Sequence, residues 1–251
     1  MAKIRSLIKI EGTLDELTFY KSQDGHLVRQ KGGVTAERIA NDPAFARTRE
    51  NGREFGTSAS AGKLMRSAFR EPINAASDSR LTSRLTKVMR QLLVYDNSSF
   101  RGERNVTIAL QSEEAQNLLK SFHFNLLAPM EKVLAKAPVY DAQSGKVGLE
   151  NFNPSKDLYW PDGANVCEMS TQWACIDFND KSYFTGTSQV ERIKNLPVTN
   201  SYSFSPIDAI QGNGILCIGL LIDFYQELNG NTYSIQSNAY NSFSLLDVSV
   251  R

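Results

Sequence analysis

The chain has 251 residues, of which 41% are hydrophobic and 22% charged, with a formal net charge of +1. This composition is typical of a globular protein and excludes a collagen-like or disordered chain. No apolar run approaches the roughly 18 residues of a membrane-spanning helix, so we expect no membrane partner.

The N-terminal residues are predicted to form strands. Residues 4–11 alternate between apolar and polar side chains, which predicts a strand with one buried face. Two further strand-like runs, 17–20 and 26–29, flank the sequence Ser22-Gln-Asp-Gly25. Because an Asp-Gly pair between such runs is a strong turn signal, we predict a β-hairpin here.

A helical pattern begins after Val34. Thr35 is placed to cap a short helix, and Asp42 followed by Pro43 predicts a second helix start. The sequence Gly56-Thr-Ser58 predicts the start of a third helix. We expect Pro72 to stop that helix, because a residue before proline avoids the helical conformation.

The strongest helix pattern follows a cap at Ser77 or Asp78. Its apolar stripe consists of Leu81, Leu85, Val88, Met89 and Leu92. Arg80, Arg84 and Lys87 are expected to point away from this stripe, toward solvent. In the preceding helix, Lys63, Arg66 and Arg70 fall on one face, and Arg66 and Arg70 are four residues apart, as are Arg80 and Arg84.

The remainder is predicted to be rich in strands. Val106, Ile108 and Leu110 alternate and predict a strand, after which Ser112 caps a short helix that ends near Lys120. The apolar run Ile215–Ile222 predicts a core strand that ends at Asp223. Turn signals at 144–145, 161–163, 179–180, 212–214 and 229–231 separate many short strands, which suggests a β-sandwich.

Charge divides the chain into two parts. Residues 1–105 hold 19 Lys and Arg against 12 Asp and Glu, whereas residues 106–251 hold 9 against 15. We therefore predict a basic hairpin-plus-helices region, 1–105, and an acidic β-rich domain, 106–251. The predicted fold class is α+β, with an N-terminal β-hairpin and helical region and a C-terminal β-sandwich-like domain.

Several residues in the first part resemble the opening of an uncharacterised family of Bacteroidota proteins. They are Gly12, Phe19-Tyr20-Lys21, Gly25, Val28-Arg29, Lys31, Asp42-Pro43, Arg47-Thr-Arg49 and Phe55. The resemblance implies an N-terminal hairpin, a short arginine-rich helical segment and a strand-rich remainder. It implies no activity and no site residues.

The sequence does not contain a complete catalytic motif. Five residues separate Gly56 from Gly62, and Leu64 follows Lys63, so this segment departs from a phosphate-binding loop. With only two histidines, His26 and His123, we expect no catalytic triad. A hydrolase on a β scaffold is the third hypothesis, which a cleft with two close carboxylates would favour.

Metal and cysteine chemistry are also not expected. The three cysteines, Cys167, Cys175 and Cys217, lie among apolar neighbours, which predicts reduced, buried thiols. Residues 177–180 hold Asp177, Asn179 and Asp180, which could bind calcium, although an ordinary turn is the leading interpretation. We therefore expect no enzyme, no cofactor and no metal, and a location in the cytoplasm or within an assembled, phage-like particle.

The arginines Arg66, Arg70, Arg80 and Arg84 are the candidate binding residues. They could form a solvated face, contact the acidic part of the same or a neighbouring molecule, or bind phosphate. The leading hypothesis is a non-enzymatic structural subunit that self-associates into a homo-oligomeric or filamentous assembly, because opposite charges favour head-to-tail contacts. The alternative is a nucleic-acid-binding protein that uses the arginine-rich helical face.

Overall fold

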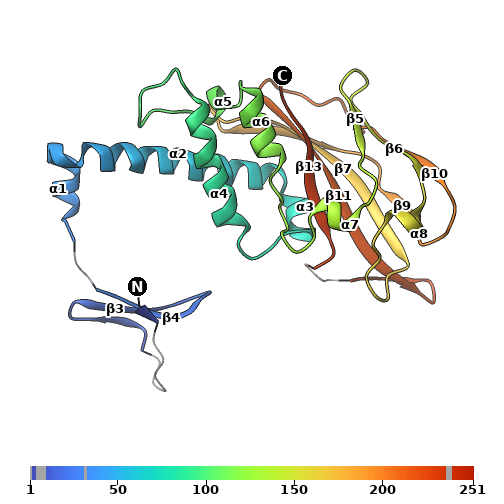
Figure 1. Ribbon diagram of the computed structural model, residues 1–251, viewed down its shortest axis with the longest axis horizontal. Coiled ribbons are helices and arrows are strands. Elements are labelled where there is room, and N and C mark those ends of the chain that lie inside the picture. The colour runs from blue at the N-terminus through green and yellow to red at the C-terminus, as the bar shows by residue number, and fades with distance from the viewer. Residues whose placement is uncertain (1, 4–9, 31–32, 236–238) are drawn as a thin grey trace. The chain divides into compact units, whose positions relative to one another are not determined.

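The computed structural model describes residues 2–3, 10–30, 33–235 and 239–251. The chain divides into two compact units, Met1–Arg49 and Glu50–Arg251. Helices and antiparallel sheets both contribute to the fold (Figure 1), which confirms the α+β class.

Unit 1 contains a four-stranded antiparallel sheet in the order β1-β4-β3-β2. Its strands are β1 (Ala2–Lys3), β2 (Gly12–Leu14), β3 (Leu17–Ser22) and β4 (Gly25–Gln30). The predicted hairpin is confirmed, since Ser22 pairs with Gly25 and the two strands remain in register to Leu17 and Gln30. The strand expected over residues 4–11 falls mainly on residues outside the described ranges.

Two short helices follow in unit 1, α1 (Ala36–Asn41) and the 3-10 helix η1 (Pro43–Phe45). Both predicted caps are confirmed: the Thr35 hydroxyl accepts a hydrogen bond from the Arg38 N–H, and the Asp42 carboxylate accepts one from Ala44. Local side-chain oxygens thus satisfy N–H groups that a helix start leaves free.

The long helix α2 (Ala46–Ala68) corrects the predicted helix start at Gly56-Thr-Ser58. These residues lie inside one continuous helix. The Ser58 hydroxyl donates to the carbonyl of Glu54, at 2.8 Å, instead of accepting from an N–H as a cap would. A serine bonded one turn back in this way is compatible with an unbroken helix.

Pro72 does not end the helix where it was predicted to. It lies inside α3 (Arg70–Ala75), and the break falls three residues earlier, at Phe69. The reason is that a proline lacks an N–H and clashes with the carbonyl four residues before it, here Ala68. Restarting the helix at Arg70 places Pro72 in the first turn, where no N–H is required.

The remaining helices belong to unit 2. They are α4 (Leu81–Leu92), the 3-10 helix η2 (Leu93–Tyr95), α5 (Val106–Ala109), α6 (Glu113–Lys120), α7 (Met130–Val133) and α8 (Pro154–Asp157). In α4 the predicted stripe is confirmed, with four of its residues fully buried and Val88 partly so. Ser112 caps α6 as predicted, since its hydroxyl accepts from the Ala115 N–H at 3.2 Å.

The strand predicted over Val106–Leu110 is wrong, because these residues form α5. The Asn105 side chain accepts a hydrogen bond from the Thr107 N–H at 2.7 Å and so caps a helical turn. Val106 and Leu110 are buried four residues apart, whereas Ile108 between them is 39% exposed. Val106 and Leu110 therefore share the buried face of a helical turn, and the same apolar spacing fits a short helix as well as a strand.

Two antiparallel sheets make up the rest of unit 2. The smaller has the order β10-β6-β5, from β5 (Val139–Asp141), β6 (Lys146–Phe152) and β10 (Asn200–Phe204). The larger has the order β12-β11-β7-β8, with β13 paired to β11 and β9 paired to β7. Its strands are β7 (Val166–Asp177), β8 (Ser182–Thr187), β9 (Glu191–Lys194), β11 (Ile215–Leu228), β12 (Asn231–Ser234) and β13 (Ser242–Val250).

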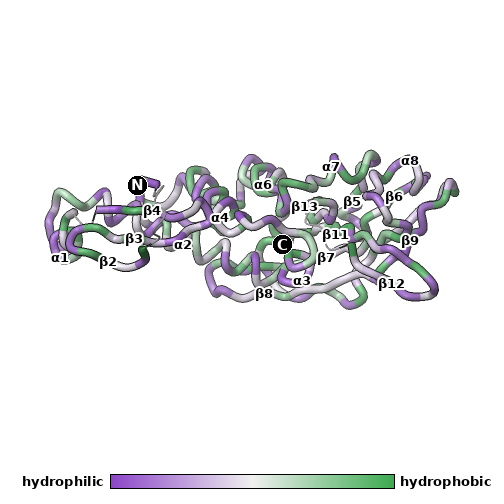
Figure 2. Tube along the Cα trace, turned by 90° about the horizontal axis from the view of Figure 1, so that it is seen from below, coloured by the Kyte–Doolittle hydropathy of each residue, from purple (hydrophilic) through white to green (hydrophobic). Residues whose placement is uncertain are grey.

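The apolar run at Ile215 forms a core strand as predicted, but Asp223 does not end it. Strand β11 continues to Leu228, and Asp223 pairs in register with Glu168 of β7. Strand β13 also contains polar residues among apolar ones, and Figure 2 colours the chain by hydropathy. Strand β11 continues through the buried Asp223 because the carboxylate of this residue accepts hydrogen bonds from Tyr225 and Asn241.

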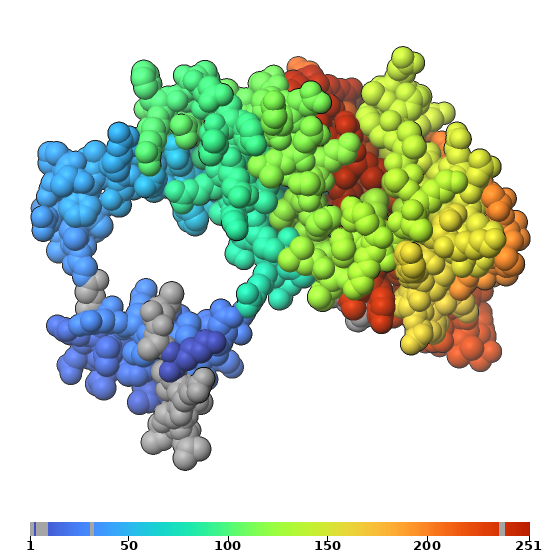
Figure 3. All heavy atoms as spheres, in the orientation of Figure 1, coloured from blue at the N-terminus to red at the C-terminus, as the bar shows by residue number. Residues whose placement is uncertain are grey.

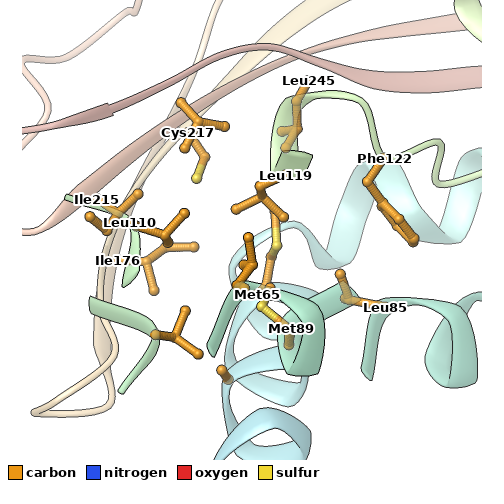
Figure 4. Close-up of a cluster of buried hydrophobic side chains, with 14 of the residues drawn as sticks. Met65, Leu85, Met89, Leu110, Leu119, Phe122, Ile176, Ile215, Cys217 and Leu245 are labelled. Carbon is orange, nitrogen blue, oxygen red and sulfur yellow. The ribbon is translucent and has the colours of Figure 1, made fainter. Parts of the chain in front are cut away.

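Each face of the large sheet is covered by a separate hydrophobic cluster. The first joins the helices to one face, and α6 packs against β13 (Figure 3). Among its buried members are Met65, Leu85, Met89, Leu110, Leu119, Ile176, Ile215, Cys217 and Leu245 (Figure 4). Burying each such side chain contributes roughly 1.5–3 kcal/mol to stability.

The second cluster lies between the opposite face and the small sheet. Its members include Val147, Leu149, Phe152, Met169, Trp173, Phe204, Ile218, Leu220 and Ile222. Side chains of a strand alternate between faces, so Ile176 of β7 joins the first cluster and Trp173 joins the second. The charge boundary at residues 105 and 106 consequently runs through unit 2, whose helices and sheet share a core.

Candidate functional site

A groove beside α2, α3 and β8 brings cationic side chains together. It has a volume of about 520 Å³, within the range of small-molecule sites. We call it the basic groove and define it by Lys63, Arg66, Arg70, Asp78 and Tyr183, which line it. Several hydroxyl and amide side chains complete its wall, among them Ser67, Asn74, Ser77, Ser79 and Thr82.

The helix geometry explains why these cations meet. Lys63 and Arg66 lie three residues apart on one face of α2, and Arg70 begins α3 directly after the break at Phe69. Met65 and Phe69 lie between them in sequence and are buried in the first cluster. Burial of the apolar face thus fixes the opposite face, and with it the cations, toward the groove.

The positive charge of the basic groove comes from these three cations. Within the described part of the chain, none of Lys63, Arg66 and Arg70 forms an ion pair with a carboxylate. Asp78 also lines the groove, but its carboxylate is bonded to Arg84 and to the N–H groups of Arg80 and Leu126. The groove therefore carries excess positive charge that an anion can neutralise.

Arg84 was predicted to point away from the core, and this is wrong. Its guanidinium pairs with Asp78, donates to the carbonyls of His123 at 2.7 Å and Phe124 at 3.2 Å, and lies over the Phe122 ring. Burial would raise the pKa of Asp78, but the hydrogen bonds and Arg84 together hold that pKa below its usual value. The Asp78–Arg84 pair is structural and does not supply charge to the groove.

The four predicted arginines therefore do not lie in one site. Arg66 and Arg70 line the basic groove, whereas Arg80 precedes α4, is exposed, and is not one of the lining residues. Lys63 was on the predicted cationic face but was not proposed as a binding residue. Tyr183 was missed altogether, because no local pattern links β8 to α2; only the tertiary fold places it there.

A second hollow adjoins the basic groove and shares Ser67, Arg70 and Tyr183 with it. It has a volume of about 380 Å³, and we call it the side pocket. Its other lining residues are Ala68, Glu71, Pro72, Gln172, Thr185, Gly186, Thr187, Ile207 and Asp208. The wall of the side pocket holds two carboxylates, Glu71 and Asp208, and one cation, Arg70, so the pocket carries no excess positive charge.

The cysteines are buried, as predicted. Burial raises the pKa of each thiol, most strongly for Cys167 and Cys217. The Asp177 carboxylate accepts hydrogen bonds from the N–H groups of Asn179 and Asp180, which is the geometry of a turn. Across the described ranges, no three or more His, Cys, Asp or Glu side chains are grouped as metal ligands.

Two carboxylates do meet on the large sheet. Asp223 pairs in register with Glu168, and its carboxylate accepts hydrogen bonds from Tyr225 at 2.9 Å and Asn241 at 2.6 Å. Burial and the Glu168 charge raise the pKa of Asp223 even though these hydrogen bonds oppose the shift. Asn241 also donates to the carbonyl of Ala75, so the network ties the sheet to α3.

The raised pKa predicts how Asp223 affects stability. A carboxyl whose pKa is higher in the folded state contributes stability that is fully present below its unfolded pKa of 3.8 and lost as pH rises through its folded pKa. We expect Asp223→Asn to remove this fall, because asparagine is uncharged and can still accept from Asn241. Urea unfolding of both proteins between pH 4 and pH 7 measures how the free energy of unfolding depends on pH. The same pH dependence in wild type and Asp223→Asn would contradict the prediction.

Comparison with family models, with curated proteins and with solved structures gives no match to this chain. Among the described residues, no helix has both the length and the apolar character needed to cross a membrane. The lining residues of the basic groove and the side pocket are therefore the basis for proposing a function.

Proposed function

We propose that this chain is a non-enzymatic nucleic-acid-binding protein and that phosphates occupy the basic groove. The observation that supports this is the grouping of Lys63, Arg66 and Arg70 in one groove without a carboxylate partner among the described residues. Arginine and lysine contacts to phosphate dominate nucleic-acid affinity. A concave cationic surface fits a phosphate chain better than it fits a flat protein surface.

Salt-dependent binding of a labelled oligonucleotide tests this proposal. If all three cations contact phosphates of a single strand, the slope of log affinity against log salt includes a contribution of about −2 from them. We expect the variant Lys63→Gln, Arg66→Gln, Arg70→Gln to lose that part of the slope and to bind roughly 100-fold more weakly at low salt.

A matched control removes three cations outside the groove. Lys87, Arg90 and Lys120 are exposed in the same unit and do not line the groove. Their replacement by glutamine is expected to leave affinity and salt slope close to wild type. Equal losses in both triple variants, or no binding of any oligonucleotide by the wild type, would overturn the proposal.

Self-association into a homo-oligomer or filament is the second candidate function. The opposite net charges of residues 1–105 and 106–251 favour it, as does an exposed apolar stretch around β9. Val190, Leu196 and Val198 are each more than half exposed there. Exposed apolar residues close together are typical of protein interfaces. The two sheets of unit 2, joined by one buried cluster, support a β-sandwich-like domain as the assembling part.

Measurement of molar mass across a salt series tests self-association. The charge-based contact predicts an oligomer at low salt that dissociates as salt is added, because screening weakens contacts between exposed charges. A strict monomer at low salt and high protein concentration would count against this candidate.

A further inference from the structure

The side pocket differs from the basic groove in the kind of chemical group it can accept. Glu71 and Asp208 are exposed carboxylates on its wall, and no ion pair engages either of them within the described ranges. Their negative charge disfavours a phosphate in this pocket. Carboxylates accept hydrogen bonds from amino and hydroxyl groups, which the bases and sugars of nucleotides carry.

The other polar groups of the pocket are partly committed to one another. The Gln172 amide donates to the Thr187 hydroxyl at 2.9 Å, and that hydroxyl donates to the carbonyl of Ser188. The two carboxylates, Thr185 and the shared Arg70 are therefore the polar side chains of this wall that can contact a ligand. Such a mixed wall fits an uncharged polar group and not a second anion.

Tyr183 lies where the two hollows meet, since it lines both of them. It belongs to β8 and is 41% exposed. An exposed aromatic ring beside a cationic groove is the arrangement on which unpaired bases stack in single-strand-binding proteins. Arg70 also lines both hollows, so a cation and an aromatic ring border the same space.

We infer that the two hollows together bind single-stranded nucleic acid, with phosphates in the basic groove, a base stacked on Tyr183, and the polar edge of that nucleoside in the side pocket. This nucleoside subsite rests on the nucleic-acid function proposed above. A duplex keeps its bases stacked on one another and cannot offer a free face to the ring. The subsite therefore selects single strands over duplexes.

Three probes of equal length separate the contributions of base and phosphate: a fluorescein-labelled single strand, the same strand with abasic sugars, and the duplex. We expect the full-length wild-type chain to bind the single strand about 10-fold or more tightly than the abasic strand. Tyr183→Leu is expected to lower single-strand affinity to the abasic level, whereas Tyr183→Phe retains the preference because it keeps the ring.

The abasic strand also separates failure of the subsite from failure of the proposed function. Equal binding of the single and abasic strands by the wild type, with the salt slope intact, would overturn the subsite and leave the phosphate groove standing. Absence of binding to all three probes would overturn both. Tighter binding of an acidic peptide than of any oligonucleotide would likewise overturn both, in favour of a protein partner.

Discussion

Replacement of Asp96 by alanine is expected to lower the free energy of unfolding by roughly 3–4 kcal/mol. Asp96 is fully buried, and its carboxylate accepts four hydrogen bonds. The donors are the Ser98 N–H at 3.1 Å, the Ser98 hydroxyl at 3.1 Å, the Ser99 N–H at 3.0 Å and the Asn105 N–H at 2.8 Å. Alanine would leave these donors without their acceptor in a buried place.

The destabilisation by Asp96→Ala should extend beyond the loop between η2 and α5. Asn105 caps α5 while its own N–H is held by Asp96, and the Gly102 N–H in the same loop donates to the Glu54 carboxylate of α2. Asp96 thus orders a loop that joins η2, α5 and α2. We expect residues 98–107 to lose protection from amide hydrogen exchange in Asp96→Ala, because the loop is no longer held in place.

The pH dependence of stability gives an independent measure of the same interaction. Burial would raise the pKa of Asp96, but its hydrogen bonds from Asn105, Ser99 and Ser98 lower it to about 2, from 3.8. A depressed pKa contributes stability that is present above the unfolded value and lost as pH falls toward the folded value. The contribution, about 2 kcal/mol, should therefore disappear between pH 4 and pH 2.

Asp141 provides the matched control for Asp96. Its carboxylate also accepts hydrogen bonds from residues two and three positions ahead, Gln143 and Ser144, but it lies in an exposed turn. Asp141→Ala should cost less than about 1 kcal/mol because water replaces the lost acceptor. Equal losses of unfolding free energy in Asp96→Ala and Asp141→Ala would contradict the structural role of Asp96.

The parts of the fold that depend on local contacts could be predicted from sequence. The hairpin at Ser22–Gly25 and the caps at Thr35, Asp42 and Ser112 each depend on hydrogen bonds within three residues. Such contacts leave a signature in the adjacent sequence. They form in the structure as predicted because neighbouring residues are enough to specify them.

The errors arise where distant residues decide the outcome. Residues 106–110 alternate in a way that suits a strand, yet the burial of Val106 and Leu110 against the helices favours α5. The Asn105 cap is a local signal for this helix that the strand prediction overlooked. Continuity of α2 through Gly56 likewise depends on packing of Ala61 and Met65 in the first cluster. Tertiary burial outweighs weak local preferences of this kind.

In the candidate site, too, some features are set by local sequence and others by distant residues. The spacing of Arg66 and Arg70 is a local property, and both residues line the groove. Arg84 has the same spacing from Arg80, but its partners include the carbonyls of His123 and Phe124, far along the chain. Charge patterning alone does not distinguish an arginine that binds a ligand from one that binds the chain's own backbone.

Arg84→Ala is accordingly expected to destabilise the protein by roughly 2–4 kcal/mol, even though arginine is usually a surface residue. Its removal leaves Asp78 and two carbonyls without their shared donor and uncovers the Phe122 ring. Arg84→Lys should recover only part of the loss, because an ammonium group cannot reproduce the planar guanidinium fork. Urea unfolding at neutral pH measures all three proteins.

Arg84 and Arg66 together give a test that separates structural from binding arginines. Arg84→Ala should lower stability, and it also leaves the Asp78 carboxylate unneutralised in the groove. The double variant Asp78→Asn, Arg84→Ala removes one negative and one positive charge and should therefore keep its oligonucleotide affinity when folded. Arg66→Gln should do the opposite, because Arg66 lines the groove and has no ion-pair partner among the described residues. If Arg84→Ala leaves stability unchanged and the double variant binds the oligonucleotide more weakly than wild type, then Arg84 acts on the surface, as its sequence pattern alone had predicted.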